Sequence, residues 1–170
     1  LQDIIEQEVY MSPADYYLIR NVSIIYKSIV KSRKYLDNWY SEVQKDKIIR
    51  YAYTHGNLKK EHILENDNLY LISWDNSMVN ILIYDLENLY NNNYMYFSIK
   101  DLLKVYENKL PLKKDEKDLL FSMLLMPIKI NYNQDEYSKI KITTEMILRL
   151  EKVLNNLESD SEKSNNNTNK

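Results

Sequence analysis

The chain contains a single glycine, Gly56, in its 170 residues. Glycine is the residue that adopts positive φ angles without strain, so a chain with one glycine has one obvious place for an unusual backbone turn. Both histidines of the chain, His55 and His62, lie close to this glycine in the sequence. Glycine-rich phosphate loops of the P-loop or dinucleotide-binding type are excluded. The segment around Gly56 is therefore the first candidate for a functional loop.

The length allows one domain with a hydrophobic core. Hydrophobic residues make up 44% of the chain and the formal net charge is -2, which argues against a basic nucleic-acid-binding surface. No apolar run approaches the ~20 residues of a membrane span, and no signal peptide opens the chain. We therefore expect neither nucleic acid nor a membrane among the partners. The lack of cysteine excludes disulfides and favours a cytoplasmic protein.

The first third of the sequence predicts one long amphipathic helix, or two joined helices, from about residue 13 to residue 45. Ser12 is suited to cap the helix, and Pro13 fits its first position. Apolar residues then recur at three-, four- and seven-residue steps, which is typical of a helix with one buried face. These residues are Val22, Ile25, Ile29, Leu36, Tyr40 and Val43.

The helical period stops between residues 48 and 77. The turn cluster 65–68 separates two short apolar runs, 63–64 and 69–72, and this pattern predicts a β-hairpin. Residues 48–53 fit either a short strand or the end of a helix.

The remaining apolar patterns predict four helices: over 81–90, from Ser98 to Leu110, over 115–126 and over 143–157. Residues 158–170 are almost all polar, which predicts a disordered tail. The predicted fold class is therefore mainly α (α+β), with one domain over residues 1–157 and one small β-hairpin.

The segment from Tyr53 to Leu64 resembles the catalytic loop of aminoglycoside phosphotransferases and their relatives. That family writes His-Gly-Asp, four residues, then Asn and two apolar residues, and here the loop reads His55-Gly56-Asn57 and ends His62-Ile63-Leu64. The segments 70–75 and 84–86 are similar to the family's next strand and to the Asp-Leu that opens its next helix. Within the superfamily, the likeness is to CotS- and YutH-type spore-coat kinase-like proteins, and it covers roughly residues 45–130.

The resemblance implies that residues 1–157 form the C-terminal lobe of a protein-kinase-like fold. Nothing before residue 45 supplies a nucleotide-binding N-terminal lobe, and the start at Leu1 rather than Met suggests a fragment of a longer protein.

The resemblance also assigns roles to residues, and three of these positions depart from the family pattern. Asn57 stands at the position of the catalytic base, but a carboxamide cannot take up a proton near neutral pH. His62 and Ser73 stand where the family has the Asn and the Asp that hold magnesium, which prefers carboxylate oxygens. Asp75, two residues past Ser73, is a candidate replacement ligand, since on a strand it would point to the same side as Ser73. Asp85 would anchor the loop by accepting backbone N–H groups.

Simpler interpretations accompany these roles. His55 corresponds to a residue that is mostly structural and hydrogen-bonded to backbone, and Gly56 is conformational. His62 fits packing or a loop-holding hydrogen bond better than metal binding, because no carboxylates stand near it at ligand spacing. Trp74 is expected in the core. Asp85 could equally be an ordinary acidic residue at a helix start.

The sequence thus predicts a degenerate kinase homologue without phosphotransfer, acting as a structural or assembly protein that binds other proteins, with spore-coat proteins among the candidate partners. It predicts no active catalytic residue, no metal site and no cofactor. One alternative is an active small-molecule or protein kinase that uses ATP and magnesium with altered ligands. The other is an unrelated helical interaction domain. The kinase interpretation requires the backbones of His55, Ser73 and Asp85 to be neighbours in space.

Overall fold

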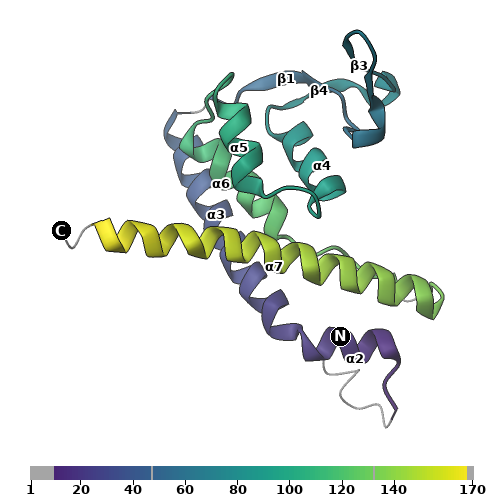
Figure 1. Cartoon of the computed structure of the whole chain (residues 1–170). Coiled ribbons are helices and arrows are strands. Elements are labelled where there is room, and N and C mark those ends of the chain that lie inside the picture. Colours follow the sequence, from purple (N-terminus) through teal and green to yellow (C-terminus); the bar gives the residue numbers. More distant parts are fainter. Residues whose placement is uncertain (1–9, 47, 132, 168–170) are drawn as a thin grey trace. The chain divides into compact units, whose positions relative to one another are not determined.

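The computed structural model describes residues 10–46, 48–131 and 133–167 (Figure 1). Helices account for 63% of the chain and strands for 10%, which confirms a mainly α fold. Contacts divide the chain into two compact units: a first unit of residues 1–31 and 125–170, and a second unit of residues 32–124. No helix among the described residues is long and apolar enough to span a bilayer.

The first unit opens with two consecutive helices, as the sequence predicted. Helix α2 spans Pro13–Arg20, and α3 spans Val22–Asp46 and continues into the second unit. The Asp15 N–H donates to Ser12 Oγ at 3.2 Å, so Ser12 is the helix cap. Asn21 separates the two helices, because its φ of -108° and ψ of 12° leave the helical range.

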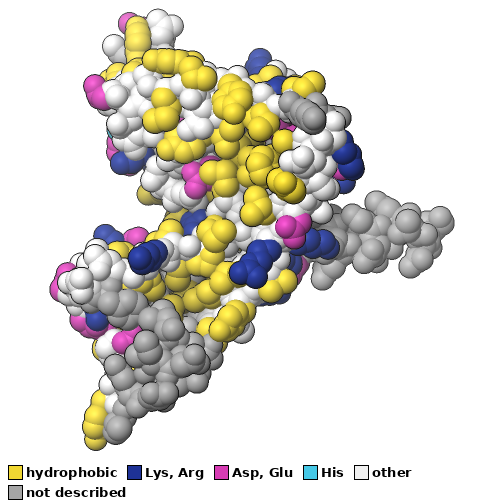
Figure 2. Space-filling model, turned by 180° about the vertical axis from the view of Figure 1, so that it is seen from behind, with side chains coloured by type: hydrophobic (Ala, Val, Ile, Leu, Met, Phe, Trp, Pro, Cys, Tyr) yellow, Lys and Arg dark blue, Asp and Glu magenta, His cyan; other side chains and the backbone are white. Residues whose placement is uncertain are grey.

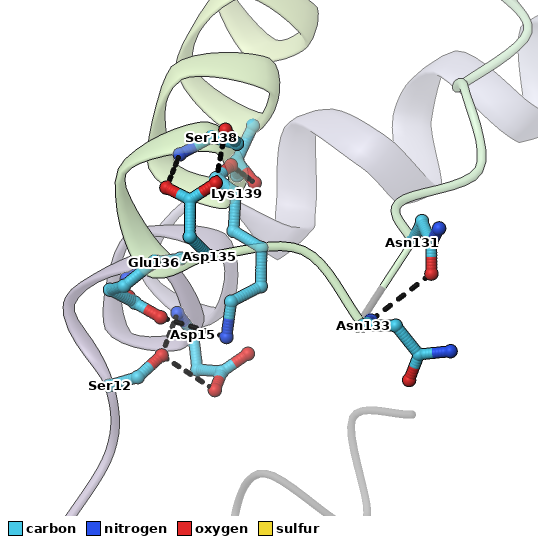
Figure 3. A network of polar contacts seen from close by, with 10 residues as sticks. Ser12, Asp15, Asn131, Asn133, Asp135, Glu136, Ser138 and Lys139 are labelled. Carbon is cyan, nitrogen blue, oxygen red and sulfur yellow. Dashed lines mark hydrogen bonds and ion pairs between the residues drawn. The ribbon is translucent and has the colours of Figure 1, made fainter.

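Helix α7 begins at Glu136 rather than at residue 143, so the predicted start was wrong. Asp135 caps it by accepting the N–H of Ser138 at 3.0 Å and the hydroxyl of the same residue at 2.6 Å (Figure 3). The Glu136 carboxylate accepts the N–H of Ala14 at 2.7 Å and pairs with Lys139 at 2.8 Å. The hydrogen bond from Lys139, followed by that from Ala14, lowers the pKa of Glu136. These contacts join the first turn of α7 to α2.

The same helix continues to Asn167, so it extends into the segment that was predicted to be a disordered tail. Adding residues to an existing helix requires only one ordered residue per hydrogen bond, so a polar extension is tolerated. Glu158 pairs with Lys27 at 2.6 Å and with Lys31 at 3.0 Å, which holds the first turn of this extension. Residues 168–170 of the predicted tail lie outside the described residues.

The core of the first unit is a cluster of aliphatic side chains from α2 and α7. Leu18, Met146, Ile147 and Leu150 are all buried in it. Partly buried side chains pack around them, namely Met11, Tyr17, Ile19, Ile24, Ile25 and Ile130. The apolar stripe predicted for the last helix therefore forms the core as expected.

The second unit contains two small antiparallel sheets rather than the single predicted hairpin. Strands β2 (Ile63–Glu65) and β3 (Leu69–Leu71) form the predicted hairpin. Strands β1 (Tyr51–Thr54) and β4 (Met78–Ile81) form the additional sheet, with Tyr51 opposite Ile81 and Tyr53 opposite Val79. Short 3₁₀ turns precede β2 (η1, Lys60–His62) and β4 (η2, Trp74–Asn76).

Besides the part of α3 from Ser32 onward, the helices of the second unit are α4 (Tyr84–Asn93), α5 (Ile99–Glu107) and most of α6 (Lys114–Leu125). Ser98 caps α5 through the N–H of Asp101 at 3.1 Å, as predicted. Buried apolar side chains from these helices and their connections form the core: Ile83, Leu86, Tyr90, Ile99, Leu103, Leu112, Leu120 and Leu124.

The start of β1 is attached to α6 by an ion pair. The Arg50 guanidinium binds both carboxylate oxygens of Glu116 and donates to the carbonyl of Pro111 at 2.9 Å. The Lys113 N–H also donates to Glu116, at 2.7 Å. Burial alone would raise the pKa of Glu116, but the hydrogen bonds and charges of Arg50 and Lys113 outweigh it and lower that pKa. This pair fixes the strand that leads directly into the loop at Gly56.

Candidate functional site

The loop His55-Gly56-Asn57 is held by Asp85, the second residue of α4. The Asp85 carboxylate accepts the backbone N–H of His55 at 2.7 Å and that of Gly56 at 3.0 Å. Hydrogen bonds to an ionised acceptor are stronger than those between neutral groups, and a helix N-terminus also favours negative charge. Asp85 therefore fixes the backbone of the loop as the predicted anchor would.

Gly56 has two reasons to be glycine. Its φ is 78°, in the left-handed region that L-residues rarely adopt. A Cβ added here would also lie 2.1 Å from the backbone oxygen of Asn76 and 2.9 Å from its carbonyl carbon. The single glycine of the chain thus lies where the loop meets the end of η2 at close range.

Both histidines hold backbone groups in place. His55 is buried, and its Nε2 lies 2.8 Å from the carbonyl oxygen of Ile72. Because a carbonyl can only accept, Nε2 carries the proton and Nδ1 accepts the Asn57 N–H at 3.3 Å. The His62 Nδ1 donates to the Asn57 carbonyl at 2.9 Å. Both ring nitrogens of His55 thus make hydrogen bonds to the backbone.

The residues after β3 do not continue as a strand. Ser73 has a left-handed backbone with φ 65°, and η2 follows it immediately. Asp75 lies in η2 rather than on a strand with Ser73, so the alternation of sides that holds for extended chain does not apply to this pair. The carbonyl of Ile72, which is bound by His55, directly precedes Ser73. The structure thus brings His55, Ser73 and Asp85 into one neighbourhood.

Trp74 is partly exposed, so its predicted place in the core was wrong. Its side chain is 43% accessible, and its indole N–H donates to the Leu71 carbonyl at 2.8 Å. Its ring lies 4.9 Å from that of His55 and is nearly parallel to that of Tyr53, with centroids 6.4 Å apart. The indole therefore covers the buried His55 and continues outward as an exposed aromatic surface.

Large apolar side chains lie next to the loop, on strands β1 and β4. Side chains directly opposite each other in an antiparallel pair point to the same face, so Tyr51, Tyr53, Val79 and Ile81 share one face of the β1–β4 sheet. The exposed fractions of the first three are 62%, 67% and 70%. Figure 2 shows exposed hydrophobic side chains gathered in contiguous groups on one face of the molecule. The period-2 alternation of Tyr51-Ala52-Tyr53-Thr54 was the signal that could have predicted this face.

A cavity of about 410 Å³ lies behind the loop, between β1, α4 and α5. Its lining is largely apolar, and it includes Thr54, Leu86, Leu102 and the carboxyl-bearing Asp85. Tyr106 also lines it, and burial raises the pKa of this phenol. The anchor of the loop is thus flanked by apolar groups rather than by bulk solvent on this side.

The chemical potential of the site follows from these partners. Asn57 offers a neutral amide, which donates and accepts hydrogen bonds but does not take up a proton near neutral pH. The Nδ1 of His62 is hydrogen-bonded to the Asn57 carbonyl of the loop, and Ser73 offers a hydroxyl. These neutral groups do not fit magnesium, which prefers carboxylate and other hard oxygen ligands. The arrangement therefore holds a defined loop shape, in which Asn57, His62 and Ser73 offer an amide, an imidazole and a hydroxyl.

The chain matches no protein-family model, and comparisons with curated proteins and with solved structures find no match either.

Proposed function

We propose that this chain is a degenerate member of the aminoglycoside phosphotransferase-like group that has kept the shape of the catalytic loop and lost its chemistry. The observation that carries the proposal is the anchored loop: Asp85 holds the N–H groups of His55 and Gly56, while Asn57 occupies the position of the base. An anchored loop without a proton acceptor is suited to binding rather than to catalysis.

The proposed activity is binding of another protein, in a structural or assembly role. Its support is the exposed apolar face next to the loop, formed by Tyr51, Tyr53, Val79 and Ile81 and extended by Trp74. Exposed apolar patches of this kind mark interaction surfaces, and Tyr and Trp are enriched where proteins meet. The resemblance to spore-coat kinase-like proteins extends the proposal to a coat layer.

The lack of phosphotransfer is tested by thermal unfolding of the full-length protein with ATP, with and without magnesium. Under the proposal, magnesium adds no shift in the presence of ATP, and no ATP is consumed. A magnesium-dependent shift that disappears in His62→Ala would instead favour an active kinase with altered ligands. Loss of one essential catalytic group commonly lowers the rate of an enzyme by several powers of ten. ATP turnover by an active kinase would therefore be readily distinguished from that of a degenerate one.

The binding role is tested with a photo-crosslinking amino acid in place of Tyr53. The expected product is a discrete adduct with another protein, and a matched label at exposed Lys141 in the first unit serves as the control. Equal labelling patterns from both positions would contradict a specific surface at the loop. A fluorescent fusion of the full-length protein in spore-forming cells tests the coat assignment, which fails if the signal never reaches the spore.

A further inference from the structure

A second candidate site lies in the first unit and is formed by residues other than those of the loop. A cavity of about 490 Å³ is formed there by α2, the start of α3, the segment 127–130 and Met146 of α7. This volume falls within the range of roughly 300–1,000 Å³ that is typical of small-molecule sites. The lining residues are mostly aliphatic, which is usual for such sites: Leu18, Ile19, Val22, Ile25, Tyr26, Ile29, Pro127, Ile128, Lys129, Ile130 and Met146.

The cavity changes character from its floor to its mouth. Leu18 and Met146 are 6% and 2% exposed and belong to the buried core of the unit. Tyr26 and Ile128 are 54% and 49% exposed, and Lys129 is exposed as well. An occupant that matches this gradient has an apolar part that reaches inward and a polar part that stays near water.

The charge at the mouth of the cavity indicates which charge the polar part of the occupant carries. Lys129 is the one charged residue of the lining, and it forms no ion pair with any residue that the structure describes. An ammonium group at the mouth of an aliphatic cavity complements an anionic head group. Among the described residues that form its floor and walls, none has a carboxylate that would attract a cationic head group.

From this gradient and this charge we infer that the first unit binds an aliphatic carboxylate, with its alkyl chain in the cavity and its head group beside Lys129. The aliphatic walls remove the chain from water, which supplies most of the affinity. Each buried methylene strengthens binding about fourfold, so affinity rises steeply with chain length until the cavity is full.

The test is calorimetric titration of the full chain with hexanoate, octanoate and decanoate below their micelle concentrations. We expect saturable binding that tightens about 15-fold for two added methylenes. Decanol, decyltrimethylammonium and vesicles of anionic phospholipid are the comparison ligands. The carboxylate should bind more tightly than the first two, and the vesicles should not bind.

Variants locate the site. Lys129→Met should weaken decanoate binding about three- to fivefold, as expected for an exposed ion pair, and leave decanol binding unchanged. Val22→Phe should block both ligands by filling the cavity, and Lys141→Glu, at an exposed lysine of the same unit that does not line the cavity, should change neither. Since Lys129 is exposed, its replacement leaves the core intact even if Val22→Phe fails to fold.

Three results would overturn the inference. One is no saturable binding of any alkanoate, and another is equal affinity for decanoate and decyltrimethylammonium. The third is binding that appears only with vesicles, which would indicate a membrane-surface contact instead of a cavity.

Discussion

Replacing Asp85 tests the central structural feature, the anchored loop. Hydrogen bonds to charged groups contribute about 1.5–3 kcal/mol each, and Asp85 accepts two of them, from His55 and Gly56. In Asp85→Asn, one carbonyl oxygen can still serve one N–H, but the amide NH₂ faces the other. We expect the free energy of unfolding of the second unit to fall by about 2–3 kcal/mol, and by about 3–5 kcal/mol in Asp85→Ala, where both donors lose their acceptor.

The chain allows the second unit to be followed separately. Its two tryptophans, Trp39 and Trp74, both lie in residues 32–124, so intrinsic tryptophan fluorescence during urea unfolding reports this unit. The midpoint should fall while the denaturant slope stays constant, because the surface exposed on unfolding does not change. Hydrogen exchange of the Gly56 amide should accelerate in parallel.

Asp75→Asn is the matched control for this experiment. It removes the same charge close to the loop, but Asp75 is exposed and makes no hydrogen bond to any described residue. Its stability should stay within about 0.5 kcal/mol of the wild type, as is usual for surface substitutions. If Asp85→Asn behaves like Asp75→Asn and leaves the Gly56 amide protected, the anchoring role is refuted.

Three further predictions concern stability. Gly56→Ala should destabilise the second unit by about 2–4 kcal/mol, because the left-handed φ and the contact with the Asn76 carbonyl both penalise a Cβ; an unchanged thermal midpoint would contradict this. Asp118 is buried, its Oδ2 has no hydrogen-bond partner among the residues that the structure describes, and burial raises its pKa above 3.8. Ionisation of Asp118 therefore destabilises the native state. Asp118→Asn should raise the free energy of unfolding by about 1 kcal/mol at pH 7 and leave it unchanged below pH 3.8, and urea unfolding at pH 7 and below pH 3.8 measures the difference. Ionisation of Glu116 has the opposite effect, because its lowered pKa means that its pairing with Arg50 stabilises the native state above pH 4.5. Arg50→Met should lower the free energy of unfolding by about 2 kcal/mol at pH 7, and this loss should shrink as the pH falls below 4.5. A pH-independent loss would show that Arg50 acts through packing alone.

The local features of this fold could be predicted where a few neighbouring residues decide the structure. Ser12 and Ser98 mark helix starts because a side-chain oxygen accepts a backbone N–H nearby in the sequence. The turn cluster at 65–68 marks a hairpin because its strands are adjacent along the chain. The anchor Asp85 could be proposed only through the resemblance, since a helix-start Asp is common without such a role.

The features that were missed depend on partners distant in sequence. Strand β4 (Met78–Ile81) shows no alternation of its own and forms only because β1 pairs with it. The start of α7 at Glu136 was missed because its first turns lack a clear apolar stripe, and the contact of Glu136 with Ala14 is not visible in the sequence. Trp74 was expected in the core, whereas its indole packs on His55 and stays partly exposed.

The left-handed backbone at Ser73 bears on how readily this site could change over evolutionary time. Among non-glycine residues, Asp and Asn adopt this conformation several times more often than most others. The chain path at Ser73 is thus already the one that an aspartate tolerates, and a single substitution could introduce a carboxylate there without moving the strand or η2. At this position a single substitution converts a neutral residue into an acidic one or the reverse, and the backbone conformation accommodates both.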